Sequence, residues 1–210
     1  MSDSDGGGCC RCCCSFILTS GLTALFLWLS LRTSNPKCSI QNFYVPALNK
    51  TLNSTTNHTI FFDLKLDNTN KDKGVHYDAV NLTFYYGPNV SFLIGNYTVH
   101  GFYQGHGKNT HRKYLLDTRG VPWDEALKAV SNGSLAVFRV DLVTAVRFRI
   151  IGFKTKRHKL DLKANVEVDG TGDKLKKKKG IRLKSGAPEL DCYHARVVLS
   201  VILSAFVLLL

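Results

Sequence analysis

The stretch TIFFDLKLDN, residues 59–68, alternates apolar and polar side chains and therefore predicts a half-buried β-strand. Its apolar residues share one face of the strand, and AVNLTFYYG (residues 79–87) repeats the pattern. The same period of two returns further along the chain at Phe138, Val140 and Leu142, at Val146, Phe148 and Ile150, and at Leu160, Leu162, Ala164, Val166 and Val168. Half-buried strands thus dominate the central part of the sequence.

Turn-forming residues separate these strands, at 67–74, 87–89, 105–107 and 169–170. One segment, WDEALKAVSNG (residues 123–133), has helical signals instead: it follows Pro122, begins with Asp124 and Glu125, and ends at Gly133. Six to eight strands without a long crossover helix favour a mostly β fold. We expect an antiparallel β-sandwich with one short helix, forming a single domain over residues 35–185.

An uncharged segment precedes this domain. CCCSFILTSGLTALFLWLSL (residues 12–31) lies between Arg11 and Arg32, and as a helix it would be about 30 Å long, one bilayer core. We expect a transmembrane signal-anchor helix over residues 12–32, with residues 1–11 on the other side of the membrane. A cleaved signal peptide is the alternative. The flanking charges weakly favour the opposite orientation, so other features must decide it.

Glycosylation sequons provide that orientation. Seven Asn-x-Ser/Thr triplets without proline exceed the roughly two that chance would give, which indicates exposure to the secretory lumen. The predicted acceptors are Asn49, Asn53, Asn57, Asn81, Asn89, Asn96 and Asn132. The domain is therefore expected outside the cell at the plasma membrane, and the crowded sites at residues 49–57 should not all be occupied.

Cysteines gather where the first segment meets the cytosol. Juxtamembrane thiols lie at the depth where acyl transferases act, so S-acylation is predicted at Cys9, Cys10, Cys12, Cys13 and Cys14. Zinc binding is a weaker alternative, because no second ligand pair or nearby histidine completes four ligands. Ser2 in place of glycine excludes N-myristoylation.

The C-terminal end has the order of a GPI-attachment signal: small residues, a polar spacer (188–196) and VVLSVILSAFVLLL (residues 197–210). We expect attachment at Ser185 or Gly186 and removal of the signal, residues 186–210. A retained membrane helix or hairpin is the alternative. Removal would leave Cys38 free, buried or paired between chains on the oxidising side, whereas retention would allow a Cys38–Cys192 disulfide.

Positive charge is concentrated near this end. The formal net charge is +12, and the run KLKKKKGIRLK (residues 174–184) supplies much of the excess. Outside the cell we expect no nucleic-acid partner, and instead an acidic partner such as headgroups or wall polysaccharide. The residues predicted to bind it are Lys174, Lys176, Lys177, Lys178, Lys179, Arg182 and Lys184.

Catalytic motifs are not found. The sequence has no GxSxG, HExxH or phosphate-binding loop, so we expect no enzyme activity, cofactor or metal. His100, His106 and His111 have spacings that allow a metal site in principle, but loop histidines beside glycines are usually solvated. For four aromatic residues we expect packing in the core or near the membrane, with a partner-binding patch as the alternative: Phe43, Tyr44, Phe102 and Tyr103.

Almost the whole chain resembles the plant non-race-specific disease resistance proteins, of the harpin-induced-like group with a late embryogenesis abundant group 2 domain. The segments that carry the resemblance are CCRCCCSFILTSGLTALFLWLSLR (9–32), NPKCSIQNFYVPALNKT (35–51), NYTVHGFYQGHGK (96–108), SNGSLAVFRVDLVTAVRFRI (131–150) and KKGIRLKSG (178–186).

The resemblance implies a fibronectin-type-III-like sandwich and non-catalytic immune signalling against bacteria at the plasma membrane. It also implies contact with the cell wall and, through residues 1–14, with a cytosolic defence regulator. The sequence contains neither of the adhesion tripeptides Arg-Gly-Asp and Asn-Gly-Asp, only VDGTGD at residues 168–173, which argues against an integrin-like adhesion role. A structural linker between plasma membrane and cell wall is the alternative function.

Overall fold

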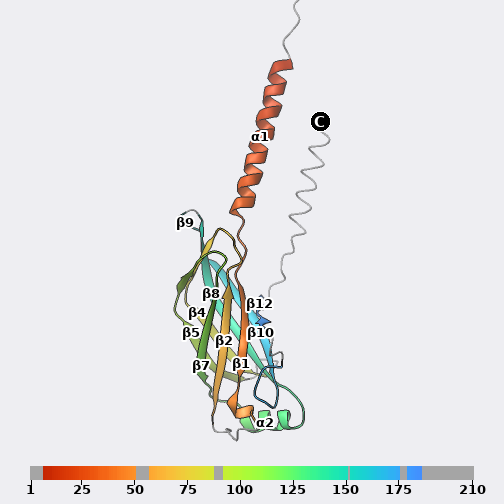
Figure 1. Cartoon of the computed structure of the whole chain (residues 1–210), viewed down its shortest axis with the longest axis vertical. Helices are drawn as coiled ribbons and strands as arrows, with labels where there is room; N and C mark the ends of the chain where they lie inside the picture. Colours follow the sequence, from red (N-terminus) through yellow and green to blue (C-terminus); the bar gives the residue numbers. More distant parts are fainter. Residues whose placement is uncertain (1–6, 51–56, 88–91, 151, 176–178, 186–210) are drawn as a thin grey trace, which may run out of the picture.

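The chain forms a two-layered β-domain with one long helix projecting from it (Figure 1). This computed structural model describes residues 7–50, 57–87, 92–150, 152–175 and 179–185. Helix α1 (Gly7–Leu31) leaves the domain at one end, which we call the near end; the opposite end, where α2 (Trp123–Ser131) lies, is the far end.

The smaller layer is a four-stranded antiparallel sheet in the order β11-β1-β2-β7. Its strands are β1 (Lys37–Tyr44), β2 (Thr59–Asp67), β7 (Asn109–Asp117) and β11 (Ile181–Arg182). The register of β1 shifts at Gln41, between Ile40 and Asn42. This bulge turns Phe43 into the core together with Cys38 and Ile40, although an unbroken alternation from Ile40 would direct Phe43 outward.

The larger layer is built around the long strand β8 (Ala136–Ile150). On one side β8 pairs with β10 (His158–Val168) and β9 (Phe153–Lys154), and on the other with β4 (Val80–Tyr86) and β3 (Gly74–Tyr77). Strands β5 (Phe92–Val99), β6 (Phe102–Gln104) and β12 (Lys184–Ser185) pair with β4, β3 and β10. All pairings are antiparallel.

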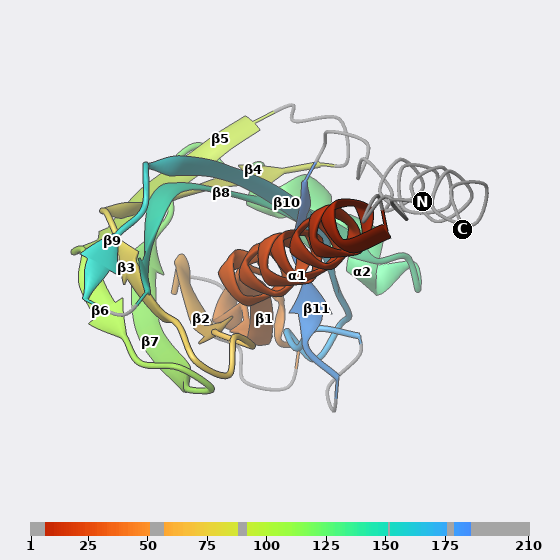
Figure 2. The ribbon, with the colours of Figure 1, turned by 90° about the horizontal axis from the view of Figure 1, so that it is seen from above.

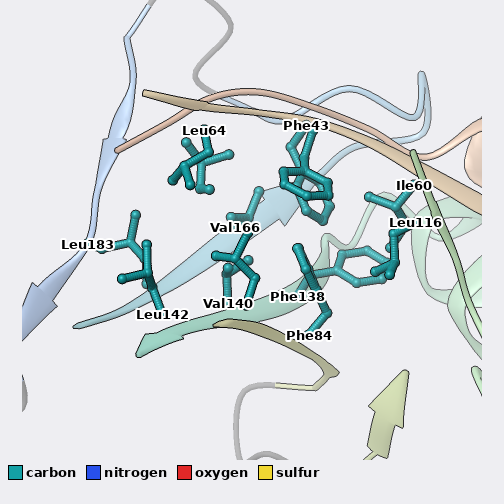
Figure 3. Close-up of a cluster of buried hydrophobic side chains, with 14 of the residues drawn as sticks. Phe43, Ile60, Leu64, Phe84, Leu116, Phe138, Val140, Leu142, Val166 and Leu183 are labelled. Carbon is teal, nitrogen blue, oxygen red and sulfur yellow. The ribbon is translucent and has the colours of Figure 1, made fainter. Parts of the chain in front are cut away.

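Aromatic side chains join the two layers. Phe43 of the smaller sheet packs against Phe138 and Phe84 of the larger one, at centroid distances of 5.5 and 6.5 Å (Figure 3). Phe62 packs against Phe84 at 5.0 Å. Each such side chain contributes about 1.5–3 kcal/mol when it is removed from water, so these contacts stabilise the facing of the two sheets.

The far end is closed by apolar residues. The 3₁₀-helix η1 (Pro46–Leu48) is entirely buried, and α2 turns Ala126 and Val130 toward it. The near end is closed by polar residues instead: Asn68, Asn70 and Lys73 are buried in the β2–β3 loop. The two ends of the sandwich therefore exclude water by different chemistry.

The expected β-sandwich with an antiparallel arrangement is confirmed, and α2 lies where the sequence predicts a helix. Two details differ. The described residues contain more strands than the six to eight expected, because several are short or carry no alternation. The predicted pair of strands around residues 138–150 is one strand, since buried Thr144 continues the inward series between Leu142 and Val146.

The predicted N-terminal helix is present as α1. Within the described part of the chain, however, no helix meets the length and apolarity expected of a membrane-crossing segment. The predicted C-terminal signal, residues 186–210, and the first residues of the N-terminal tail lie outside the described residues.

Candidate functional site

A basic pocket lies on the edge of the sandwich where the C-terminal strand passes from one sheet to the other. Strand β11 pairs with β1, strand β12 pairs with β10, and Leu183 between them is buried with its amide donating to the carbonyl of Cys38 at 2.9 Å. The pocket encloses about 480 Å³. Its cations come from four strands: Lys37, Lys159, Arg182 and Lys184.

This pocket contains only part of the basic run in the sequence. Arg182 and Lys184 line it, Lys179 is exposed but does not line it, and residues 176–178 lie outside the described residues. Lys174 departs from the expected surface stripe, because it is buried with its Nζ donating to the carbonyl of Lys179 at 2.7 Å. Burial lowers the pKa of this lysine.

Two pocket residues were missed by the sequence analysis. Lys37 and Lys159 are far from residues 174–184 in the chain and join them only through strand pairing. Asp161 adds one carboxylate, whose Oδ1 is buried without a hydrogen-bond partner in the described residues. The balance of charge suits a phosphate or carboxylate ligand, held by cations that remain largely hydrated.

A second hollow, of about 440 Å³, lies on the outer face of the smaller sheet. Tyr44, Phe61 and Leu115 are cross-strand neighbours there, and Tyr44 and Phe61 are 6.2 Å apart. Phe61 is 42% exposed and Leu115 is 54% exposed. Asn42 and Lys113 provide polar groups at its rim, so this face offers an aromatic shelf with hydrogen-bonding neighbours.

The other aromatic residues singled out from the sequence have structural contacts. Phe43 is in the core, and Phe102 stacks on Tyr77 at 4.8 Å with the guanidinium of Arg112 4.9 Å above its ring. Tyr103 is 49% exposed and lies across Gly74, where an added Cβ would be 2.2 Å from its hydroxyl. Packing therefore accounts for Phe43 and Phe102.

The described sequons lie on the surface. Asn57, Asn81, Asn96 and Asn132 are exposed, and Asn49 is half-buried with its amide donating to the hydroxyl of Tyr44 at 3.1 Å. Asn81 and Asn96 belong to the paired strands β4 and β5, where Thr98 of the second sequon donates to Asn81 Oδ1 at 3.0 Å. Asn53 and Asn89 lie outside the described residues.

Two cysteines have described side chains. Cys14 is exposed on α1, and the side chains of Cys9, Cys10, Cys12 and Cys13 lie outside the described residues. Cys38 is free and completely buried, and this burial raises its pKa to about 12. Its thiol therefore stays protonated and acts as a small apolar group in β1.

The histidines whose spacing would allow a metal site do not form a metal-binding cluster in the described residues. Among the described residues there is no group of three or more histidine, cysteine or acidic side chains that could hold a metal ion. His111 contacts Asp63 instead, with 3.1 Å between Nδ1 and Oδ2. Of the two predicted GPI-attachment residues, Ser185 is exposed at the end of β12 and Gly186 lies outside the described residues.

Comparison with known proteins identifies the family. No family model matches the chain. A solved structure of a protein from Archaeoglobus fulgidus aligns with 53% of this chain and 85% of its own, at 10% identity and a TM-score of 0.30, too low to support any argument. Protein NDR1 from Arabidopsis thaliana is 50% identical over 189 residues, which are 87% of this chain and 85% of that protein. The chain therefore belongs to the NDR1-like family of plant disease resistance proteins.

Proposed function

We propose that this protein is a non-enzymatic component of plant immune signalling, anchored in the plasma membrane by α1 with the sandwich outside the cell. Its similarity to Protein NDR1 over most of both chains is the observation that carries the proposal. In this arrangement residues 1–11 are the cytosolic part, and residues 1–14 contact a defence regulator.

The surface of α1 supports a lipid environment. Phe16, Ile17, Phe26 and Trp28 are 73%, 62%, 69% and 53% exposed on a helix that extends away from the sandwich (Figure 1). Water is a poor solvent for such a surface, and a bilayer would cover all sides of the helix at once.

The polar groups of α1 are compatible with this environment. Thr19 donates to the carbonyl of Ser15 at 2.9 Å, and Thr23 donates to that of Thr19 at 2.7 Å. A helix already satisfies its backbone groups, and these bonds satisfy the hydroxyls as well. The segment thus brings few unsatisfied donors into hydrocarbon.

Features of the domain support its location outside the cell. The exposed sequons at Asn57, Asn81, Asn96 and Asn132 are accessible for glycosylation. On α1, outside the domain, the exposed thiol of Cys14 is accessible for S-acylation. Lipid attachment at Ser185 or Gly186 would add a second tether on the same side as the domain.

The signalling role is tested in a plant line that lacks this protein. We expect weakened resistance to bacteria that deliver effectors, restored by the wild-type chain. A variant lacking residues 2–8 should reach the membrane but fail to restore resistance. Normal resistance in the line without the protein would overturn the proposed function.

The topology has a separate test. Glycosidase treatment should lower the apparent mass of the wild-type protein, and Asn81→Gln combined with Asn96→Gln should reduce this shift. Asn165→Gln, an exposed asparagine outside any sequon, is the matched control and should leave the shift unchanged. Protease digestion of sealed vesicles with the cytosolic side outward tests the topology even if the protein carries no glycans. We expect the sandwich to be protected in intact vesicles and cleaved after lysis. Cleavage of the sandwich in intact vesicles would contradict the topology.

A further inference from the structure

The near end of the sandwich carries a strongly basic surface around the base of α1. Its loops and strand ends come from distant parts of the sequence and are brought together by the two sheets (Figures 1 and 2). The exposed cations there are Lys37, Lys71, Lys108, Arg149, Lys154 and Lys156. Two of the nearby carboxylates already have cationic partners: Asp72 pairs with Lys73, and Asp78 pairs with Arg147 and Arg157.

The far end is more mixed in charge. Its exposed or half-exposed carboxylates lie at the end of β7, in α2, in β10 and in the turn after β10: Asp117, Asp124, Glu125, Glu167, Asp169 and Asp173. Cations are interspersed with them: Lys50, Arg119, Lys128, the buried Lys174 that follows Asp173, and the exposed Lys179, whose carbonyl accepts from Lys174. The far end thus carries both signs of charge, whereas exposed cations gather around the base of α1 at the near end.

The β8–β9 hairpin carries the most exposed large hydrophobic side chain among the described residues. Phe153 is 80% exposed at its tip, and it pairs with Ile150 on one face of the hairpin. Arg149 pairs with Lys154 on the other face. Like charges directly opposite each other destabilise a strand pair, and an anion between them removes this repulsion. The hairpin is thus apolar on one face and cationic on the other.

The hairpin lies level with the base of α1 (Figure 1). Hydrogen bonds hold this base against the sandwich: the amide of Ser34 donates to Asn70 Oδ1 at 2.9 Å, and Asn70 Nδ2 donates to the carbonyl of Ser34 at 2.8 Å. Lys73 Nζ donates to the carbonyl of Arg32 at 3.0 Å, immediately after α1 ends. A cation at a helix C-terminus is favourable. These hydrogen bonds therefore hold the near end of the sandwich against the base of α1.

The cations at this end also act on a half-buried group. His76 lies on β3 beside β8, and burial lowers its pKa, with further lowering by Lys154, Arg149 and Arg147. Lys154, Arg149 and Arg147 thus all act on His76 in the same direction.

We infer that the near end is a membrane-contact surface: the tip of the β8–β9 hairpin inserts Phe153 into the lipid interface while Arg149, Lys154 and Lys156 bind anionic headgroups. The inference rests on the proposed anchoring by α1, which brings this end to the bilayer. An aromatic side chain at headgroup depth, flanked by cations, is the arrangement by which peripheral elements bind anionic bilayers. The partner is the bilayer itself.

Tryptophan quenching in the full-length protein tests this arrangement. The chain contains two tryptophans, Trp28 in α1 and Trp123 at the far end. Three single-tryptophan proteins are compared: Trp28 alone, Phe153→Trp in the Trp28→Phe and Trp123→Phe background, and Phe61→Trp in the same background. Phe61 is an exposed phenylalanine near the far end and provides the matched control.

Each protein is reconstituted in vesicles of brominated phosphatidylcholine with or without phosphatidylglycerol. We expect quenching of the Phe153→Trp indole that rises with phosphatidylglycerol and falls with added salt, and no quenching of the Phe61→Trp indole. Each lysine near an anionic surface strengthens docking about fivefold. Lys154→Gln with Lys156→Gln should therefore weaken the docking equilibrium roughly 25-fold, whereas Lys128→Gln at the far end should leave it unchanged.

The outcomes separate this inference from the proposed function. Quenching of Trp28 without quenching of Phe153→Trp would leave the anchor intact and overturn the membrane-contact surface. Absence of Trp28 quenching would overturn the anchor. Quenching of Phe153→Trp that does not depend on phosphatidylglycerol would refute headgroup binding, and displacement of the indole from lipid by soluble polygalacturonate would refute the bilayer as the preferred partner.

Discussion

The two ends of the sandwich are closed against water in different ways. At the far end, buried apolar side chains of η1 and α2 cover the core. At the near end, Asn68, Asn70 and Lys73 fill the corresponding place and bind backbone groups of neighbouring segments. The far end depends on burial of apolar surface, while the near end depends on hydrogen bonds that also hold the base of α1.

The two closures differ in what they contribute. An apolar closure needs no further contact once water is excluded. A polar closure fixes geometry more strongly than it adds stability, because each net hydrogen bond contributes only about 0.5–1.5 kcal/mol. At the near end this geometry sets how α1 and the β8–β9 hairpin are placed relative to each other.

The largest effect is expected from opening the far end. Leu48 is completely buried in η1, so Leu48→Ala leaves a cavity and should lower the free energy of unfolding by about 2–5 kcal/mol. Leu115→Ala removes the same atoms from an exposed position and should change it by less than about 0.5 kcal/mol. Urea unfolding followed by circular dichroism measures both. Equal effects would show that η1 does not close the core.

A matched pair of glycines compares the turns at the two ends. Both have positive φ, +77° at Gly172 and +59° at Gly107. A Cβ at Gly172 would be 2.5 Å from the carbonyl oxygen of Val45, whereas a Cβ at Gly107 meets nothing within 4 Å. Gly107→Ala should cost about 1–2 kcal/mol for the backbone alone. Gly172→Ala should cost about 2–4 kcal/mol, because Val45 or the turn must also move.

Thermal unfolding of the two variants gives this comparison directly. A lower melting temperature for Gly172→Ala than for Gly107→Ala is the expected order. The reverse order would mean that the near-end turn, whose Gly107 amide donates to the carbonyl of Asn70 at 2.8 Å, is the more constrained of the two.

A smaller effect is expected from removing the polar closure of the near end. Asn68 Nδ2 donates to the carbonyls of Lys73 and Gly105, at 2.8 and 3.0 Å, and its Oδ1 accepts from Asn70. Asn68→Ala leaves these groups unsatisfied and should cost about 1–3 kcal/mol. Asn165→Ala, on the exposed face of β10, is the control.

Hydrogen exchange sharpens this result, since loss of Asn68 should also loosen Asn70 and its bonds to Ser34. We expect faster exchange of the Ser34 amide in Asn68→Ala and unchanged exchange at the far end. Unchanged exchange of the Ser34 amide would show that the hydrogen bonds of Asn68 do not help to hold the base of α1.

Sequence reasoning succeeded where burial alone decides the structure. The alternation at residues 59–68 and 79–87 predicts β2 and β4, and the signals around Pro122 and Gly133 predict α2. It failed where one local event changes the pattern. The bulge at Gln41 breaks the alternation of β1, and Thr144 interrupts the apolar series of β8 without interrupting the strand.

The candidate surfaces show the same limit. Arg182 and Lys184 were found because they belong to a run of charges, but Lys37 and Lys159 join them only through strand pairing. Lys174 belongs to the same run and is nevertheless buried, since charge density in a sequence does not report which side chain the turn covers. Phe153 gave no signal, because exposure of a single phenylalanine depends on the end of a hairpin.

The smallest predicted effect concerns the pH dependence of the near end. His76 faces Tyr103 of β6, with ring centroids 4.6 Å apart, and lies near Arg147 and Arg149 of β8 and Lys154 of β9. Burial first, and then these cations, lower its pKa below the ordinary value of 6.5. The folded state therefore takes up a proton at lower pH than the unfolded state does.

The sign of the effect follows from this order. Well above pH 6.5 His76 is neutral in both states and contributes no pH dependence. As the pH falls through 6.5, the unfolded state binds a proton first, so the free energy of unfolding decreases. Lys154→Gln should raise the pKa of His76 and lessen the decrease, and His76→Gln should abolish this contribution. Urea unfolding at a series of pH values between about 5 and 7.5, compared between wild type and His76→Gln, isolates the histidine from the carboxylates that titrate in both proteins. If the two curves run parallel, neither burial nor the basic end shifts the pKa of His76 measurably. If they diverge below pH 6.5 and the divergence becomes smaller at high salt, Lys154 and Arg149, which we assign to headgroup binding, add to the effect of burial on this histidine.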